Sequence, residues 1–485
     1  MFSCRLLERL LCAALLLSVT ARGDEENYWP FYVHRSAEGS KAASTEWLGP
    51  LIFSQSGPGR SFGLRPIFQQ THLDNVDQGN ALYPFFTWRR ENEYRSFSFF
   101  QLVNARAEMP EGARPDHRFD LWPFYFSREA HDPADSYRAF FPLGGTIKNR
   151  FGKDRISFIL FPLHARTEKS GKHTLHAPWP FLRFIDGEGY HGFEFWPLFG
   201  RSRHDEDYDR QFYLWPLIYK SVSNLSEETP DVKIGVLPFY SRDTGPGYIS
   251  ETYAWPFFGY AHRTIPYRYD EQRYFWPFLV QGRGDDRLVN RWAPFYTHSV
   301  IKGSEKTWLL WPFYRNQRWQ ADGVAQQKNQ FLFFLYWSLE QQSLTNPSAA
   351  PAHKSHLWPL YSSWNNGAGQ RQVQALSPFE VFFPGNDTVR QLWSPLFALY
   401  RYNRQPDASA RHSLLWSAIT YRHSPVAKEF HLGPLFSVHA DASRRRLALG
   451  NGILGLQRRA GERWRFFLFD FRPKAAIKAN PATSP

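Results

Sequence analysis

The stretch "QFYLWPLIYK" at residues 211–220 places a proline at the centre of an apolar and aromatic run. Such a run is typical of a β-strand. Pro216, however, has no N–H to donate to a sheet. Trp-Pro followed by Phe or Leu occurs nine times in the 485-residue chain, so this arrangement is a repeat. The structural core of the repeat is therefore expected at Trp29, Pro30, Trp122, Pro123, Trp179, Pro180, Trp196, Pro197, Trp215, Pro216, Trp255, Pro256, Trp276, Pro277, Trp311, Pro312, Trp358 and Pro359.

Further copies of the repeat keep the proline and its apolar follower but replace the tryptophan. These ten centre on Pro50, Pro66, Pro84, Pro142, Pro162, Pro238, Pro294, Pro378, Pro395 and Pro434. Five more apolar segments fall on the same rhythm without a proline: "SFSFFQLV", "QFLFFLYW", "SLLWSAIT", "LGNGILGL" and "RWRFFLFDF". The proline is kept more often than the tryptophan, which indicates an architectural role at mid-strand, such as a bulge or a corner.

The segments between the repeats are rich in Gly, Asp, Asn and Ser, as in "DGEGYHG", "SRDTGPGY" and "PGNDTV". These are turn compositions suited to hairpin loops. The pattern predicts an all-β antiparallel meander of about 24 repeated strands. We expect one β-repeat domain over residues 24–471, with negligible helix.

Closure into a large outer-membrane β-barrel is the favoured architecture. An eight-residue apolar strand is about 26 Å long and covers roughly 20 Å along the membrane normal when tilted. Charged residues bracket many runs, for example Arg210 and Lys220. A solenoid β-repeat, whose proline would mark a corner, is one alternative. Two features argue against a simple porin-like barrel and favour a propeller-like or sandwich-like sheet. Both strand faces are apolar, and each mid-strand proline would delete a ladder hydrogen bond worth about 1 kcal/mol.

The N-terminus has the pattern of a secretory signal peptide over residues 1–23. A basic segment precedes the apolar core "LLCAALLLSV", and small residues precede Asp24. Cys4 and Cys12 both lie in this segment, so a mature chain would have no disulfide, thiol nucleophile or cysteine-ligated zinc. We expect an exported bacterial protein of the outer membrane, periplasm or cell surface. The tail, residues 472–485, is expected to be disordered.

The formal charge of +13 predicts anionic partners. Membrane lipid is the first expectation, with anionic polysaccharide or lipopolysaccharide as further possibilities. Export argues against nucleic acid. Oligomeric state is left open.

No motif supplies a reaction. The acidic loop "RHDEDYD" at residues 203–209 lacks the glycine and terminal glutamate of a helix–loop–helix calcium site and is expected to be a solvated hairpin tip. His431 and His439 flank Pro434 on one expected strand, about 26 Å apart, too far to share a metal. No catalytic, cofactor-binding or metal site is expected.

The sequence therefore favours a non-enzymatic envelope protein acting as a pore, scaffold or assembly component. The alternative is a soluble periplasmic or surface protein that binds anionic polysaccharide or a protein.

Overall fold

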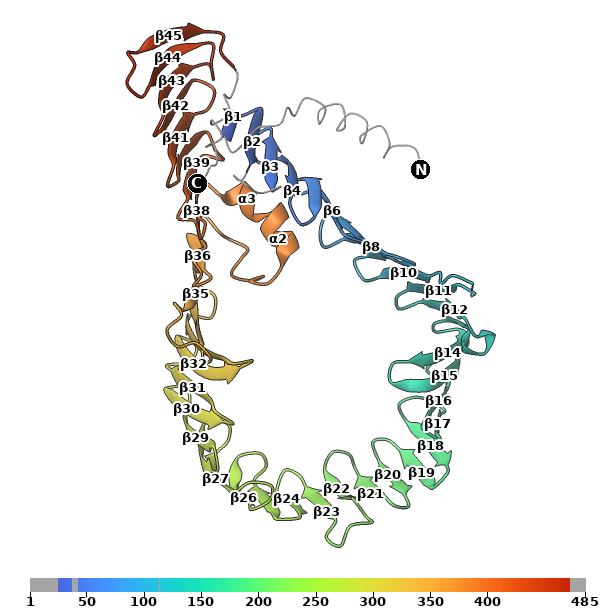
Figure 1. Cartoon of the computed structure of the whole chain (residues 1–485). Helices are drawn as coiled ribbons and strands as arrows, with labels where there is room; N and C mark the ends of the chain where they lie inside the picture. Colours follow the sequence, from blue (N-terminus) through green and yellow to red (C-terminus); the bar gives the residue numbers. More distant parts are fainter. Residues whose placement is uncertain (1–24, 37–41, 113, 472–485) are drawn as a thin grey trace, which may run out of the picture. The chain divides into compact units, whose positions relative to one another are not determined.

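The computed structural model describes residues 25–36, 42–112 and 114–471, and there the chain is an antiparallel β-meander (Figure 1). Strands pair in chain order within a 45-stranded sheet, which confirms the all-β repeat. The pairings of the described strands do not include one between β1 and β45. The expected signal peptide and disordered tail lie outside the described residues. Within them, no helix combines the length and apolar character needed to cross a membrane.

The described chain divides into two compact units, with the boundaries after Pro84 and after Pro351. The first unit combines the N-terminal and C-terminal parts of the chain. Its elements are β1 (Glu25–Tyr28), β2 (Tyr32–Ser36), β3 (Ala43–Trp47), β4 (Ile52–Ser56), β5 (Arg60–Leu64), β6 (Phe68–Leu73), β7 (Val76–Ala81), β35 (Ala352–Leu357), β36 (Tyr361–Asn365), β37 (Arg371–Ala375), α2 (Asp387–Leu392), α3 (Ser394–Phe397), β38 (Tyr400–Arg404), β39 (Ala410–Leu414), β40 (Ile419–His423), β41 (Ala427–Leu432), β42 (Phe436–Asp441), β43 (Arg444–Leu449), β44 (Leu454–Arg459) and β45 (Arg465–Leu468).

The second unit spans Phe85–Pro351, and its described residues, all but residue 113, form a meander with one 3₁₀ turn, η1 (Pro133–Asp135). Its strands are β8 (Phe86–Glu91), β9 (Tyr94–Phe99), β10 (Val103–Glu108), β11 (Asp116–Leu121), β12 (Tyr125–Glu129), β13 (Tyr137–Phe140), β14 (Gly144–Arg150), β15 (Lys153–Ile159), β16 (His164–Lys169), β17 (Lys172–His176), β18 (Leu182–Gly187), β19 (Tyr190–Phe195), β20 (Phe199–His204), β21 (Tyr208–Tyr213), β22 (Ile218–Ser223), β23 (Asp231–Val236), β24 (Tyr240–Gly245), β25 (Tyr248–Tyr253), β26 (Phe258–Arg263), β27 (Tyr269–Phe275), β28 (Leu279–Gly284), β29 (Arg287–Trp292), β30 (Tyr296–Ile301), β31 (Ser304–Leu309), β32 (Tyr314–Ala321), β33 (Val324–Phe331) and β34 (Tyr336–Ser343).

The repeated prolines lie in turns, apart from Pro378 and Pro395, so the expectation of a mid-strand proline is wrong. In the run at residues 211–220, β21 ends at Tyr213 and β22 begins at Ile218. The Leu217 N–H donates to the Leu214 carbonyl at 2.8 Å and closes a four-residue turn. Pro216 occupies its third position, where a β-turn uses no N–H, so no ladder bond is lost. Each apolar run is therefore two half-strands and the turn between them, which is why the chain has nearly twice the expected number of strands.

Two of the expected repeats form a helical insertion. Pro378 and Pro395 lie between β37 and β38, where α2 and α3 replace a tight turn. The Asn386 side chain caps α2 by accepting from the Val389 N–H at 3.0 Å. Leu392 is fully buried, so the helix is held by packing as well as by its cap. The expectation of strands at these two prolines is corrected here, whereas the described residues otherwise contain almost no helix, as expected.

In the second unit, neighbouring strands are hardly offset from one another along their length. From strand to strand, the residue next to each apolar turn pairs with the equivalent residue of its neighbour, apart from a bulge between Arg273 and Phe275. The aligned residues, which we call the apolar row, are Phe86, Phe99, Val103, Leu121, Tyr125, Phe140, Gly144, Ile159, His164, Leu182, Phe195, Phe199, Tyr213, Ile218, Val236, Tyr240, Tyr253, Phe258, Phe275, Leu279, Trp292, Tyr296, Leu309, Tyr314, Phe331 and Tyr336. All the apolar turns of this unit consequently lie along one edge of the sheet.

Candidate functional sites

The apolar turns of the second unit form an exposed border, which we call the aromatic edge. It comprises Phe100, Leu102, Trp122, Phe124, Leu143, Leu160, Leu163, Trp179, Phe181, Trp196, Leu198, Leu214, Trp215, Leu217, Phe239, Trp255, Phe257, Trp276, Phe278, Phe295, Leu310, Trp311, Phe313, Phe333 and Phe334. Contiguous exposed apolar surface is typical of sites that contact proteins, ligands or membranes.

Backbone hydrogen bonds tie each turn of the aromatic edge to the next. The bonds around one turn are typical: the Leu214 and Trp215 N–H groups donate to the Leu198 and Pro197 carbonyls, both at 2.7 Å. Side chains continue the connection, because the Trp196 and Trp215 ring centroids lie 6.2 Å apart. The edge is therefore a continuous ordered surface, not a series of independent loops.

The tryptophans of the Trp-Pro motifs mostly face outward. In the second unit, the seven such side chains, from Trp122 to Trp311, are 36–57% exposed. Trp29 and Trp358, in the first unit, are partly buried, and the Trp358 Nε1–H donates to the Pro378 carbonyl at 3.2 Å. The motif thus shapes the turn through its backbone and leaves most of its rings available for contact.

Basic side chains lie behind the aromatic edge. Arg201, Lys220 and Arg242 sit at the same register level, two residues from the apolar row. At the rise of a strand, this is about 7 Å from the row. Arg201 forms an ion pair with Asp209 at 2.6 Å, and Arg242 approaches Glu251 at 3.5 Å. Polarity therefore changes along the strands, from aromatic at one edge to charged farther in.

The opposite edge carries the polar turns. Asp205, Glu206 and Asp207 are exposed at the tip between β20 and β21, where the His204 Nδ1 and Asp207 Oδ2 atoms lie 3.0 Å apart. This confirms the expected solvated hairpin tip. The two edges of the second unit differ sharply in chemistry, and only the aromatic one offers a large apolar surface.

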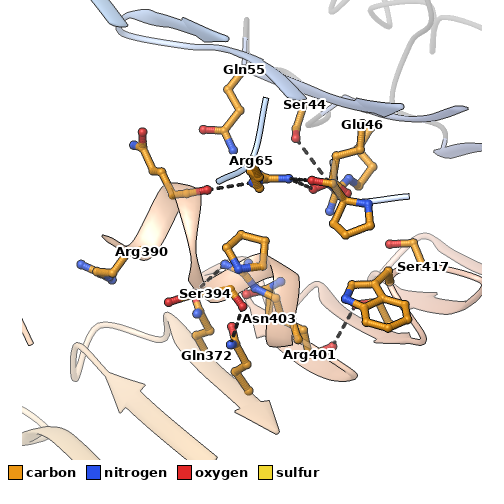
Figure 2. Close-up of a pocket in the computed structure, with 18 of the residues that line it drawn as sticks. Ser44, Glu46, Gln55, Arg65, Gln372, Arg390, Ser394, Arg401, Asn403 and Ser417 are labelled. Carbon is orange, nitrogen blue, oxygen red and sulfur yellow. Dashed lines mark hydrogen bonds and ion pairs between the residues drawn. The ribbon is translucent and has the colours of Figure 1, made fainter. Parts of the chain in front are cut away.

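A second candidate site is a polar cavity of about 380 Å³ in the first unit (Figure 2). We call it the arginine cavity. It lies among β2–β4, the turn after β5, the α2–α3 insertion and β37–β39. Its lining comprises Arg35, Ser44, Glu46, Pro50, Gln55, Arg65, Gln372, Gln374, Glu380, Asp387, Arg390, Gln391, Ser394, Pro395, Ala398, Arg401, Asn403, Arg411, Ser413, Trp416 and Ser417.

Glu46 joins two of the cavity's arginines. Its carboxylate accepts from Arg35 at 2.7 Å and from Arg65 at 3.1 Å. Burial alone would raise the pKa of Glu46, but the two guanidinium groups outweigh it and lower that pKa. Arg65 is almost fully buried and donates further to the Pro50 and Gln391 carbonyls, at 2.7 and 2.8 Å. These contacts fasten the N-terminal strands to the helical insertion.

Arg411 is likewise fully engaged. Its guanidinium donates to both carboxylate oxygens of Glu25, at 2.7 and 2.8 Å, and to the Ser417 hydroxyl at 3.0 Å. The nearby Asn27 side chain donates to the Ser417 carbonyl at 2.8 Å. Strand β1 is thereby bound to β39 and the turn that follows it, although the two segments are nearly 390 residues apart.

Arg401 differs from its neighbours. The Arg401 guanidinium makes one hydrogen bond within the described residues, to the Gln372 side-chain oxygen at 3.1 Å, and its Nε is buried without a partner. Burial, assisted by the positive charge of Arg35, lowers its pKa to about 10. Glu46 and Glu380 interact with it electrostatically, yet among the described residues no ion pair within 4 Å joins either carboxylate to Arg401. Figure 2 shows Arg401 on the side of the cavity opposite Arg65 and Glu46.

The two histidines considered from sequence lie on different strands, which corrects their expected placement. β41 and β42 pair so that Glu429 faces His439, and the His439 Nδ1 lies 3.4 Å from the Glu429 carboxylate. His431 is on the same strand as Glu429, and burial lowers its pKa. The error has the same origin as the strand count, since the run around Pro434 is a hairpin. Within the described chain, no group of three or more His, Cys, Asp or Glu side chains is arranged to hold a metal.

Sequence reasoning missed the arginine cavity. Glu46, Arg65 and Arg401 are unremarkable polar residues in their local segments. The local segment was misleading as well, because residues 384–389, "PGNDTV", have the composition of a hairpin loop but lead into α2. Comparison with protein-family models and with curated proteins found no match for the chain.

Proposed function

We propose that this protein is a non-enzymatic component of the bacterial cell envelope that acts at a lipid surface through its aromatic edge. The observation that carries the proposal is the continuous exposed border of Trp, Phe and Leu side chains along one side of the second unit. Aromatic rings are favoured at the boundary between lipid and water. Apolar faces of interfacial proteins enter the headgroup region by about 5–10 Å. This depth would accommodate the turns of the aromatic edge together with the apolar row behind them.

Charge supports anionic lipid as the partner. The chain carries a formal charge of +13. Arg201, Lys220 and Arg242 lie about 7 Å behind the apolar row, a distance from which they reach the level of lipid phosphates when the edge is inserted. Basic residues near a membrane surface each contribute about 1 kcal/mol to binding anionic bilayers.

A closed outer-membrane barrel is the alternative form of this proposal. Barrel closure requires tilted strands and a staggered register. The register of the second unit has almost no stagger, and most of its strands have six residues. A six-residue strand is about 20 Å long and covers roughly 15 Å when tilted, less than the apolar band of about 25 Å on such barrels. Contact through the edge therefore fits this geometry better than a span.

Vesicle flotation tests the proposal. The full-length mature chain should float with vesicles containing anionic phosphatidylglycerol and bind neutral vesicles more weakly. Replacing Trp215 and Phe239, which are 51% and 73% exposed, with serine should weaken binding at least about tenfold. The matched control replaces Ile265 and Ile301, exposed at the polar edge, with serine and should bind like the wild type.

Three results would count against edge contact. These are no flotation with either vesicle, unchanged binding by the Trp215→Ser, Phe239→Ser variant, or equal weakening in the control.

Carbonate extraction of cell membranes distinguishes contact through the aromatic edge from a closed barrel. An edge-bound protein is released by carbonate, whereas a barrel stays in the membrane and changes its gel mobility on heating.

A soluble envelope protein that binds anionic polysaccharide is the second candidate. Exposed rings along the aromatic edge, with Arg201 and Lys220 about 7 Å behind the apolar row, favour it, because rings stack on sugars and cations pair with acidic groups. Recovery of the protein from periplasm without detergent, together with retention on an acidic glycan column, would favour this function over lipid contact.

A further inference from the structure

We propose that the arginine cavity binds a small polyhydroxylated anion, a sugar acid or sugar phosphate, and that Arg401 pairs with its anionic group. This inference concerns the first unit and is independent of lipid contact by the aromatic edge. It rests on a count of charges and of unsatisfied polar atoms in the cavity.

The charges leave one cation without a close counter-ion. Arg35 and Arg65 share Glu46, Arg411 has Glu25, and Arg390 approaches Asp387 at 3.4 Å. Arg401 has no ion pair among the described residues, and its Nε is buried. A buried charge without a partner is costly, so an anion that pairs with it is bound with a large gain. The planar guanidinium suits a carboxylate or a phosphate.

Two carboxylates compete for Arg401: Glu46, which already binds Arg35 and Arg65, and Glu380, which is buried and lines the cavity. Glu380 also interacts electrostatically with Lys354 and His356. The lining carries five arginines against Glu46, Glu380 and Asp387, and Glu25, which pairs with Arg411 from outside the lining, is a fourth carboxylate. The balance therefore favours an anion even with Glu380 ionised.

The remaining lining is rich in groups that recognise hydroxyls. Gln55, Gln372 and Gln391 have side-chain amides, and Ser44 and Ser413 have hydroxyls. The Gln372 and Gln391 side-chain oxygens already accept from protein donors, and the Ser413 hydroxyl donates to the Arg401 carbonyl, so these groups bind a ligand through their remaining hydrogen-bonding positions. Two further lining atoms are buried without a protein partner: the Gln374 Oε1, which accepts, and the Ser394 Oγ, which donates and accepts. A ligand bearing both an anionic group and several hydroxyls matches this mixture, whereas an apolar ligand does not.

The volume agrees with a monosaccharide-sized ligand. The cavity measures about 380 Å³, at the lower end of the range of about 300–1,000 Å³ typical of small-molecule sites. It is built by rigid elements from both ends of the chain, held by the Glu46–Arg65 and Glu25–Arg411 ion pairs. Such preorganisation lowers the ordering cost of binding.

Isothermal titration calorimetry of the full-length mature chain tests the proposal. The probes are glucuronate, glucose 6-phosphate, inorganic phosphate and glucose. We expect one of the two sugar anions to bind, and glucose and inorganic phosphate to bind at least about tenfold more weakly. Failure of both sugar anions to bind at millimolar concentration overturns the proposal. Inorganic phosphate or glucose binding as tightly as the sugar anions also overturns it.

Two variants of strand β38 test whether the ligand binds at Arg401. Arg401→Gln should weaken sugar-anion binding about 10- to 100-fold, because a charge-assisted hydrogen bond is lost. Arg404→Gln, on the same strand β38 but exposed, should bind like the wild type. If Arg401→Gln binds normally, or Arg404→Gln is equally impaired, the assignment to Arg401 is wrong.

Thermal unfolding separates ligand binding from a structural role. A structural role for Arg401 predicts that Arg401→Gln lowers the Tm without ligand. Binding by an otherwise unpaired arginine predicts an unchanged or higher Tm without ligand and loss of the ligand-induced rise. If circular dichroism shows that Arg401→Gln does not fold, Arg401→Lys is the test variant.

Arg401→Lys keeps the positive charge but loses the planar guanidinium, and it should bind the sugar anion at least about tenfold more weakly than the wild type. Unchanged binding by Arg401→Lys overturns the proposal.

Discussion

The Trp215 N–H donates to the Pro197 carbonyl at 2.7 Å and so joins two turns that are 18 residues apart in the chain. The bond shows what the Trp-Pro motif does in this fold. The proline needs no donor in the turn, while the residue before it donates to the preceding turn along the edge. A row of turns becomes a continuous border in this way, and the rings it carries remain exposed.

Hydrogen exchange should report this border directly. The amides of Leu214, Trp215 and Leu217 all donate to backbone carbonyls, so we expect them to exchange about as slowly as the amides of the flanking strands. The amide of Glu228 is the comparison, because it lies in a loop and donates to no backbone carbonyl within the described residues. Mass spectrometry of exchanged peptides measures the difference. Equal, fast exchange at all four amides would mean that the turns are not ordered.

A proline placed inside a strand should destabilise the protein, whereas the natural prolines in the turns do not. Gln211 pairs with Arg201 on one side and Lys220 on the other, so β21 is an interior strand. Gln211→Pro is expected to lower the free energy of unfolding by about 1–3 kcal/mol, because a ladder bond is lost and its acceptor stays unpaired. Urea denaturation followed by tryptophan fluorescence measures the effect. Gln211→Ala, which keeps the N–H, is the control, and an equal loss in both variants would contradict the expectation.

The sequence predicted the repeat and its antiparallel order but misplaced the turns. Phe212 and Tyr219 are neighbours across a hairpin, yet the composition between them is that of one continuous strand. Proline is among the strongest local signals of a turn. Here the apolar residues around Pro216 masked that signal, because turns are usually polar whereas these form an exposed apolar border. The strand length estimated from the run was therefore too long, and the argument for a membrane-spanning strand was weakened with it.

The arginine cavity could not be predicted because its contacts are distant in sequence. The Arg65 side chain donates to the Gln391 carbonyl across 326 residues, and Glu25 meets Arg411 across 386. No local pattern encodes such pairs, whose partners are brought together by the packing of the first unit. The residues that look most informative in the sequence shape the turns, and those that build the cavity look ordinary.

Glu46 should be essential to the first unit because two guanidinium groups depend on it. Glu46→Gln leaves Arg65, whose side chain is 2% exposed, without its charged partner. We expect a loss of about 3–5 kcal/mol in the free energy of unfolding, as is typical when one member of a buried pair is removed. The same change at Glu91, in an exposed pair with Arg89, should cost less than about 1 kcal/mol. Similar losses in urea denaturation of the two variants would show that Arg65 does not rely on Glu46.

The Glu25–Arg411 pair should make stability depend on acid pH. Burial opposes ionisation of Glu25, but the Arg411 guanidinium outweighs it and lowers the pKa of Glu25 to about 2, from an ordinary value of 4.5. Since the pKa is lower in the folded state, the stabilisation is complete above pH 4.5 and is lost as the pH falls toward 2. A shift of this size corresponds to roughly 3 kcal/mol for a buried group.

Glu25→Gln isolates this contribution. At neutral pH the variant should be less stable than the wild type, because Arg411 is left buried without its carboxylate. Between pH 4.5 and pH 2 the wild type should lose more stability than the variant, so the gap between them narrows. Denaturation curves at pH 7, 4.5, 3 and 2 measure this gap. A gap that stays constant over the whole range would show that Glu25 is not the group whose protonation weakens the first unit.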